Sequence, residues 1–121
     1  MKKNILVFES DNDVSRTWKE QMSFLENIQI KFSKNENELK TYLDKNNIHI
    51  LIINENNLNP KSIKIIKKVD KKPFFIILTN KNSKEIRYDF NDKKNIVFKT
   101  PIKLNKLFKK INEILKNKNQ L

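Results

Sequence analysis

Short apolar runs alternate with helix-forming patterns along the whole chain, and this alternation restricts the fold more than any other feature of the sequence. Four runs are almost continuously apolar, as in strands buried on both faces of a sheet; they lie at residues 5–8, 48–53, 74–78 and 96–98. A fifth run, residues 28–32, alternates apolar with polar side chains, as in a half-exposed edge strand. Apolar residues at helical spacing predict helices at 13–25, 39–43, 60–69, 82–90 and 104–115.

Five strand–helix units in succession predict an α/β domain. Right-handed crossovers make it a doubly wound five-stranded parallel sheet, with order 2-1-3-4-5 and helices on both faces, as in flavodoxin-like folds. We expect one domain over residues 1–121 with a frayed tail at 116–121, because no linker or repeat divides the chain. Asp13 is the expected N-cap of the first helix. Trp18 shares a helix face with Val14 and Met22, which favours the core over an interface for this tryptophan.

The composition excludes several kinds of active site. The chain has no cysteine, which removes disulfides, thiol catalysis and zinc–thiolate sites. It has no glycine, which removes the P-loop, the dinucleotide-binding turn and the nucleophile elbow. His49 is the only histidine and begins the central strand, so it suits neither a multi-histidine metal centre nor a Ser–His–Asp triad. We therefore predict no enzymatic activity and a structural role for His49.

The formal charge of +12 has two interpretations. A basic protein of this kind can bind nucleic acid through its phosphates. The alternative is a bias of composition, because the chain also has no alanine and only two arginines, and lysine then becomes the default surface residue. Arginine is the usual reader of phosphates and bases, so we favour the second interpretation. The start of the chain lacks the features of a signal peptide, and no apolar stretch approaches a membrane span; these features predict a bacterial-type cytoplasmic protein.

Polar residues follow four of the predicted strands at their carboxyl ends, where doubly wound sheets place functional groups. These strand ends are Glu9-Ser10, Asn54, Thr79 and Lys99-Thr100-Pro101. Together they resemble the four strand ends of the CheY-like receiver domain of response regulators. In that family the first strand ends in an acidic pair, the third in the phosphorylated aspartate, the fourth in Thr or Ser, and the fifth in Lys-Pro. The resemblance covers nearly the whole chain and implies the (βα)5 receiver fold.

The sequence departs from the family at most of the positions that carry its chemistry. The acceptor position holds Asn54, whose neutral amide is a poor nucleophile and cannot form the acyl phosphate. The acidic pair holds Glu9-Ser10, so the aligned pocket keeps one carboxylate where the family has three. Thr100 aligns with the lysine of Lys-Pro, while Lys99 lies one residue earlier and faces the other side of a regular strand. Val97 aligns with the switch aromatic of the last strand.

These residues form a degenerate phosphoacceptor pocket, whose predicted members are Glu9, Ser10, Asn54, Thr79 and Thr100, with Asp11, Asn56, Lys99 and Pro101 nearby. Simpler roles are open for several of them. Asn54 can cap the turn that follows its strand, Glu9 can be a solvated carboxylate or can cap a backbone amide, and Thr79 can be a β-branched strand residue. Glu55, Asp11 and Asp13 could rebuild a metal site, but helix capping is the better use of Asp13. We expect no cofactor and no bound Mg²⁺.

The resemblance and the departures together predict a stand-alone receiver-like protein of two-component or phosphorelay signalling that binds protein partners without being phosphorylated. Its expected partners are a histidine kinase, a phosphotransfer protein or another regulator. By resemblance, residues Lys81 to Phe90 and Lys103 to Leu115 are the candidate interface, and a homodimer could use it together with the fifth strand. Two alternatives stay open: a working phosphoreceiver with an unusual acceptor, and a basic nucleic-acid-binding protein on the same fold.

Overall fold

A parallel sheet of five strands forms the middle layer of the protein, in the order β2-β1-β3-β4-β5. Its strands are β1 (Lys3–Phe8), β2 (Ile28–Ser33), β3 (Ile50–Asn54), β4 (Phe74–Thr79) and β5 (Asn95–Lys99). The structure is a computed structural model, and it describes residues 3–22, 27–45, 47–69, 72–79, 95–99 and 103–116. All four strand pairings are parallel, so the predicted sheet order and direction are confirmed.

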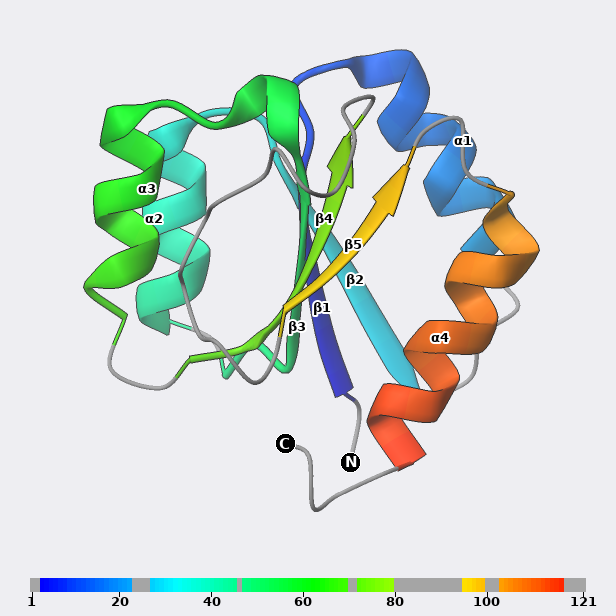
Figure 1. Cartoon of the computed structure of the whole chain (residues 1–121). Helices are drawn as coiled ribbons and strands as arrows, with labels where there is room; N and C mark the ends of the chain where they lie inside the picture. Colours follow the sequence, from blue (N-terminus) through cyan, green and yellow to red (C-terminus); the bar gives the residue numbers. More distant parts are fainter. Residues whose placement is uncertain are drawn as a thin grey trace.

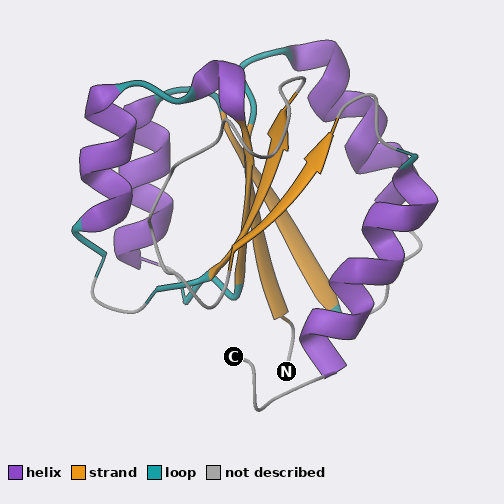
Figure 2. Cartoon of the chain, viewed as in Figure 1, coloured by secondary structure: helices purple, strands orange, loops and turns teal. Residues whose placement is uncertain are grey.

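Helices cover both faces of the sheet (Figure 1). Helices α1 (Asn12–Met22) and α4 (Leu104–Lys116) lie on one face, and α2 (Glu36–Lys45) and α3 (Pro60–Lys67) lie side by side on the other. A short 3₁₀ turn, η1 (Glu55–Asn57), connects β3 to the loop before α3 (Figure 2). The helix predicted at 82–90 and the predicted frayed tail beyond 116 lie outside the described residues.

Each face of the sheet has its own apolar core, because successive residues of a strand point to opposite faces. In β3, Ile50 and Ile52 pack with α1 and α4, whereas Leu51 and Ile53 pack with α2 and α3. All four of these side chains are fully buried, as the continuous apolar run predicts. Trp18 belongs to the first core and is 8% exposed, which confirms its predicted core position.

The start of α1 differs from the prediction in two ways. Asp11, and not Asp13, is the N-cap: its Oδ1 accepts hydrogen bonds from the backbone N–H groups of Asp13 (2.8 Å) and Val14 (3.2 Å). Asp13 instead forms an exposed ion pair with Arg16 at 3.4 Å. Val14, predicted to share the core face, is 37% exposed, because it lies in the first turn at the rim of the sheet.

The start of α3 follows the sequence closely. Pro60 occupies the first helical position, where its missing N–H has no intrahelical role. Asn59 accepts a hydrogen bond from the Ser62 N–H, and the Ser62 hydroxyl oxygen accepts one from the Asn59 N–H, which together form a capping box. This tight start holds the preceding loop, and therefore η1, against the end of β3.

At the opposite end of the central strand, His49 precedes β3 and its Nδ1 accepts a hydrogen bond from the Asn4 N–H at 3.1 Å. This contact links β1 to β3 far from the carboxyl ends of the strands, in line with the predicted structural role. In the parts of the chain that the structure describes, no helix is both long enough and apolar enough to cross a membrane.

Candidate functional site

The carboxyl ends of β1, β3 and β4 bring four of the predicted site residues to one edge of the sheet. Glu9 follows β1, Asn54 ends β3 and Thr79 ends β4. Glu9 is 7% exposed and Thr79 2% exposed, while Asn54 is half-buried and Ser10 is exposed. The site therefore combines a buried carboxylate, an amide and two hydroxyls, with the apolar sheet beneath them.

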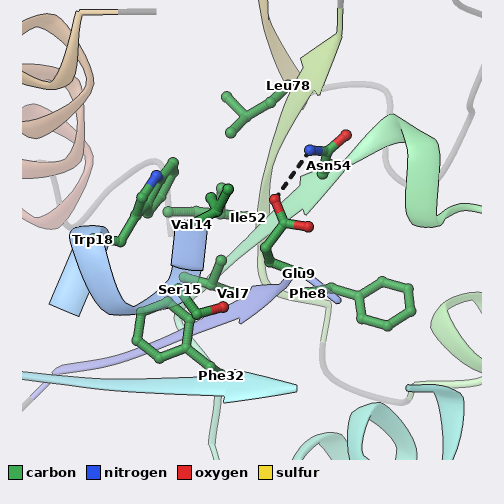
Figure 3. Close-up of a pocket in the computed structure, with 10 residues that line it drawn as sticks. All are labelled: Val7, Phe8, Glu9, Val14, Ser15, Trp18, Phe32, Ile52, Asn54 and Leu78. Carbon is green, nitrogen blue, oxygen red and sulfur yellow. Dashed lines mark hydrogen bonds between the residues drawn. The ribbon is translucent and has the colours of Figure 1, made fainter. Parts of the chain in front are cut away.

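Glu9 and Asn54 contact each other directly (Figure 3). The Asn54 Nδ2 donates a hydrogen bond to the Glu9 Oε1 at 3.1 Å. The Asn54 Oδ1 accepts one from the Asn56 N–H at 3.0 Å. These two bonds set the orientation of the amide. In the flipped orientation the Asn54 Oδ1 would face the Glu9 carboxylate, and the Asn54 Nδ2 hydrogens would face the Asn56 N–H. The predicted role of Asn54 as a turn cap is confirmed, and its N–H group partly balances the Glu9 charge.

Asn57, which the sequence did not mark as a site residue, completes the ring of donors around Glu9. Its Nδ2 donates to the Glu9 Oε2 at 3.1 Å and to the Phe8 carbonyl at 3.2 Å. Its Oδ1 accepts a hydrogen bond from the Ser10 hydroxyl at 2.8 Å. The Asp11 N–H is a further donor to the Glu9 Oε2, at 3.4 Å. Glu9 is thus a buried carboxylate that accepts hydrogen bonds from backbone and amide N–H groups. Of the two roles that the sequence leaves open for Glu9, the cap of a backbone amide is confirmed and the solvated carboxylate is not.

Glu55 brings a second buried carboxylate to this edge of the sheet. It is 7% exposed, and its Oε1 accepts a hydrogen bond from the Thr79 hydroxyl at 3.0 Å. The sequence alignment counted one carboxylate in the pocket, and the structure corrects that count. The 3₁₀ turn explains the difference, because the first residue after β3 turns back to β4 instead of following the loop outward. Thr79 is therefore more than a β-branched strand residue.

A small cavity lies beneath Glu9 and Asn54, on the face of the sheet that packs against α1 (Figure 3). It measures about 10 Å³, which is near the minimum for one water molecule. Its walls are mostly apolar side chains, including those of Trp18, Ile52 and Leu78. The buried Ser15 hydroxyl lines the same cavity and has no hydrogen-bond partner among the described residues. Among the described residues, the space that this cavity offers is about that of a single water molecule.

Comparison with known proteins finds no match among family models or curated sequences. Solved structures do match. The receiver domain of the Francisella response regulator 1452 superposes with a TM-score of 0.77 at 18% identity, covering 95% of this chain and 98% of that one. The signal receiver domain of an HD domain-containing protein from Pseudomonas fluorescens gives 0.80 at 13% identity over the whole of both chains.

This chain has the receiver fold. A third example is the receiver domain of Saccharomyces cerevisiae Ssk1, crystallised with the histidine phosphotransfer protein Ypd1; it gives a TM-score of 0.73 at 20% identity, covering 93% of this chain and 88% of that one. Because the sequences have diverged this far, the match concerns the architecture. The polar residues at the strand ends therefore have to be judged on their own contacts.

The residues that could rebuild a metal site do not converge in this receiver fold. Asp11 caps α1, Asp13 pairs with Arg16, and Glu55 accepts from Thr79. Among the described residues, no group of three or more Asp, Glu, His or Cys side chains lies close enough to hold a metal ion. Asn56 enters the site through its backbone N–H, and its side chain is exposed.

The described side-chain oxygen atoms of Glu9, Asn54 and Asn57 already accept hydrogen bonds. Magnesium needs carboxylate, carbonyl or water oxygens with lone pairs directed at the ion. Both Glu9 oxygens accept N–H groups, and the amide oxygens of Asn54 and Asn57 accept hydrogen bonds from Asn56 and Ser10. An ion at this point would have to displace several of these bonds and would face the Nδ2 hydrogens of two amides.

The fifth strand contributes less to the site. Lys99 pairs with Thr79 in the sheet register and its side chain is exposed. Val97 packs on the α2–α3 side of the sheet and is half-buried. The predicted site residues Thr100 and Pro101 lie outside the described residues, as does the predicted interface segment Lys81 to Phe90.

Proposed function

We propose that this receiver-fold protein acts in two-component or phosphorelay signalling by binding a protein partner, without accepting a phosphoryl group and without catalysing a reaction. The observation that carries the proposal is the closed hydrogen-bond network around Glu9. Its two amides, Asn54 and Asn57, supply N–H donors at the position where receivers keep a nucleophilic aspartate and its metal ligands. An amide has neither the charge nor the lone-pair reactivity to attack phosphorus.

The contact between Glu55 and Thr79 supports the same proposal. Receivers keep Thr or Ser at the position of Thr79, and here that hydroxyl already donates to a buried carboxylate. A phosphoryl group that needed the same hydroxyl would have to break this bond and would bring more negative charge beside Glu55. Such a juxtaposition of like charges in a buried site is unfavourable.

A protein partner is the ligand class that fits this proposal. The Ssk1 receiver domain was crystallised with a histidine phosphotransfer protein. We propose a histidine kinase, a phosphotransfer protein or another regulator as the partner of this chain, in the cytoplasm of a bacterium. Residues Lys103 to Leu115 belong to the proposed contact surface, where α4 exposes a row of lysines.

Intact mass spectrometry tests the proposal. The protein is incubated with acetyl phosphate and Mg²⁺, with and without a chelator, beside a receiver that is known to accept phosphate. We expect no phosphate-sized mass increase in this chain while the reference receiver is labelled. A Mg²⁺-dependent mass increase would overturn the proposal and favour a working phosphoreceiver. Salt-sensitive binding to duplex DNA with no binding to signalling proteins would favour a nucleic-acid function instead.

A further inference from the structure

We infer that the groove between α2 and α3 is a docking site for an acidic amphipathic segment of a protein partner. The groove lies on the far face of the sheet from α1 and α4 (Figure 1). It has a volume of about 230 Å³ and is lined by Lys40, Asp44, Lys61, Lys64, Ile65, Lys68 and Val69. This is too small for a drug-sized ligand but has room for one or two apolar side chains of a partner.

The charge of the groove is strongly unbalanced. Four of the seven lining residues are lysines, and Asp44 is the only acid among them. Asp44 already lies 3.8 Å from the Lys40 Nζ in an exposed ion pair. Among the described residues, no ion pair involves the three lysines on the α3 side of the groove. Lys61 lies near enough to the Glu36 carboxylate to lower its pKa, so the charges of Lys64 and Lys68 in particular are available to carboxylates brought by another molecule.

The spacing of these lysines matches one face of a helix. Lys61, Lys64 and Lys68 follow one another at intervals of three and four residues, which places them on a stripe about 10 Å long. Lys64 and Lys68 also suit the negative C-terminal end of the α3 dipole. Lys61 lies in the first turn, where a cation opposes the dipole. The stripe therefore is not explained by helix stability alone.

The floor of the groove favours a protein over a nucleic acid. Ile65 and Val69 are half-buried and lie beside the lysine stripe, packed on the core between the sheet and α2–α3. An apolar floor flanked by cations complements a helix that carries leucines flanked by glutamates, the helix-in-groove mode of recognition. Neither helix carries an arginine for base contacts. The inference rests on the proposed function only in taking a protein as the ligand.

The test measures binding of a synthetic helical peptide that carries two leucines flanked by glutamates, using fluorescence anisotropy. Two peptide controls replace either the glutamates by glutamine or the leucines by serine. The protein variant is the triple change Lys61→Gln, Lys64→Gln and Lys68→Gln. Its matched control changes to glutamine three exposed lysines that lie outside both the groove lining and the proposed contact surface, Lys19, Lys34 and Lys116, which removes the same charge from other parts of the protein.

We expect the α3 variant to bind the acidic peptide at least ten-fold more weakly than the unchanged protein, and the matched control variant to bind within about two-fold of it. Either peptide control should also lose at least ten-fold in affinity. Equal weakening by the two protein variants would overturn the inference, because net charge alone would then explain binding. So would tighter binding to a charge-matched DNA duplex than to the peptide. This result is independent of the mass-spectrometric test, which reads the strand-end pocket and not the groove.

Discussion

The strand-end pocket and the α2–α3 groove, two hollows among the described residues, differ in how their charged groups are partnered. The strand-end pocket buries the Glu9 carboxylate above a cavity of about 10 Å³ and surrounds it with N–H donors from its own chain. The α2–α3 groove, at about 230 Å³, leaves its lysines in solvent with few acids beside them. Burying a charged group costs free energy unless the chain supplies hydrogen-bond donors or opposite charges for it. An exposed charge is solvated and stays accessible to a binding partner. The strand-end pocket is therefore a structural site whose polar groups are partnered within the chain, whereas the α2–α3 groove is a surface suited to binding another molecule.

The largest effect is expected from enlarging the cavity of the strand-end pocket. Trp18→Ala removes a wall of the cavity and a large side chain of the first core, so we expect a loss of about 3–5 kcal/mol in the free energy of unfolding. Urea unfolding followed by circular dichroism measures it. Val14→Ala is the matched control, because Val14 lines the same cavity but is 37% exposed. Equal losses in the two variants would mean that Trp18 does not form the core wall.

A carboxylate placed directly beside Glu9 should disrupt the hydrogen bonding of the strand-end pocket. Asn54→Asp removes the amide donor 3.1 Å from the Glu9 Oε1 and replaces it with a like charge. We expect a loss of about 1–3 kcal/mol in unfolding free energy at neutral pH. Mg²⁺ should recover part of that loss, because two adjacent carboxylates suit the ion.

Thermal unfolding with and without Mg²⁺ measures this change. Asn56→Asp is the control of equal charge, since the Asn56 side chain is exposed and only its backbone N–H enters the site. If both variants lose the same stability, or if Mg²⁺ raises the melting temperature of the unchanged protein by the same amount, the donor network around Glu9 is not what holds the pocket.

The buried pair at the end of β4 should have a smaller effect. Thr79→Val keeps the shape of the side chain and removes the hydroxyl that donates to Glu55. We expect a loss of about 1–2 kcal/mol, because a buried carboxylate then loses one donor. Glu55→Gln keeps an acceptor oxygen for Thr79 and should cost less. A double-mutant cycle with these two changes measures their coupling; a coupling free energy of zero would show that the contact adds no stability.

The smallest expected effect is on the pH dependence of stability, through the Glu36 carboxyl at the start of α2. The Asn59 side chain, a backbone hydrogen bond and the nearby Lys61 charge lower the pKa of Glu36 below its ordinary value of 4.5, against the opposing effect of burial. A lowered folded-state pKa means that the contribution to stability is present above the unfolded-state pKa and is lost as the pH falls through the folded-state value.

Glu36→Gln should therefore change stability by less than about 1 kcal/mol at pH 7 and flatten its decline in acid. Chemical unfolding at several pH values from about 3 to about 7, a range that includes the titration of carboxyl groups, measures the free energy of unfolding of both proteins. An unchanged acid decline in the variant would assign it to other carboxylates.

Much of the architecture follows from local pattern. The continuous apolar run of β3 requires burial on both faces, and that burial requires helices on both sides of a parallel sheet. Asn59 and Pro60 mark the start of α3, because the Asn59 side chain caps the helix and Pro60, which has no N–H, suits the first helical position. Trp18 was placed in the core by its spacing alone. The cap of α1 was misjudged, because Asp11 and Asp13 are both good capping residues and only the path of the chain selects between them.

The layered fold and the gathering of Glu9, Asn54 and Thr79 at one edge therefore follow from local sequence pattern, since periodicity and strand direction depend on residues that are neighbours in the chain. The packing of the folded chain was needed to show that Asn57 and Glu55 belong to that edge and that lysines of α3 border an apolar groove. These contacts are made by side chains that are far apart in sequence, or by side chains whose direction is set by the 3₁₀ turn after β3. No local sequence pattern predicts these contacts, because hydrogen bonds and charge pairs depend on which side chains lie close together in the folded chain.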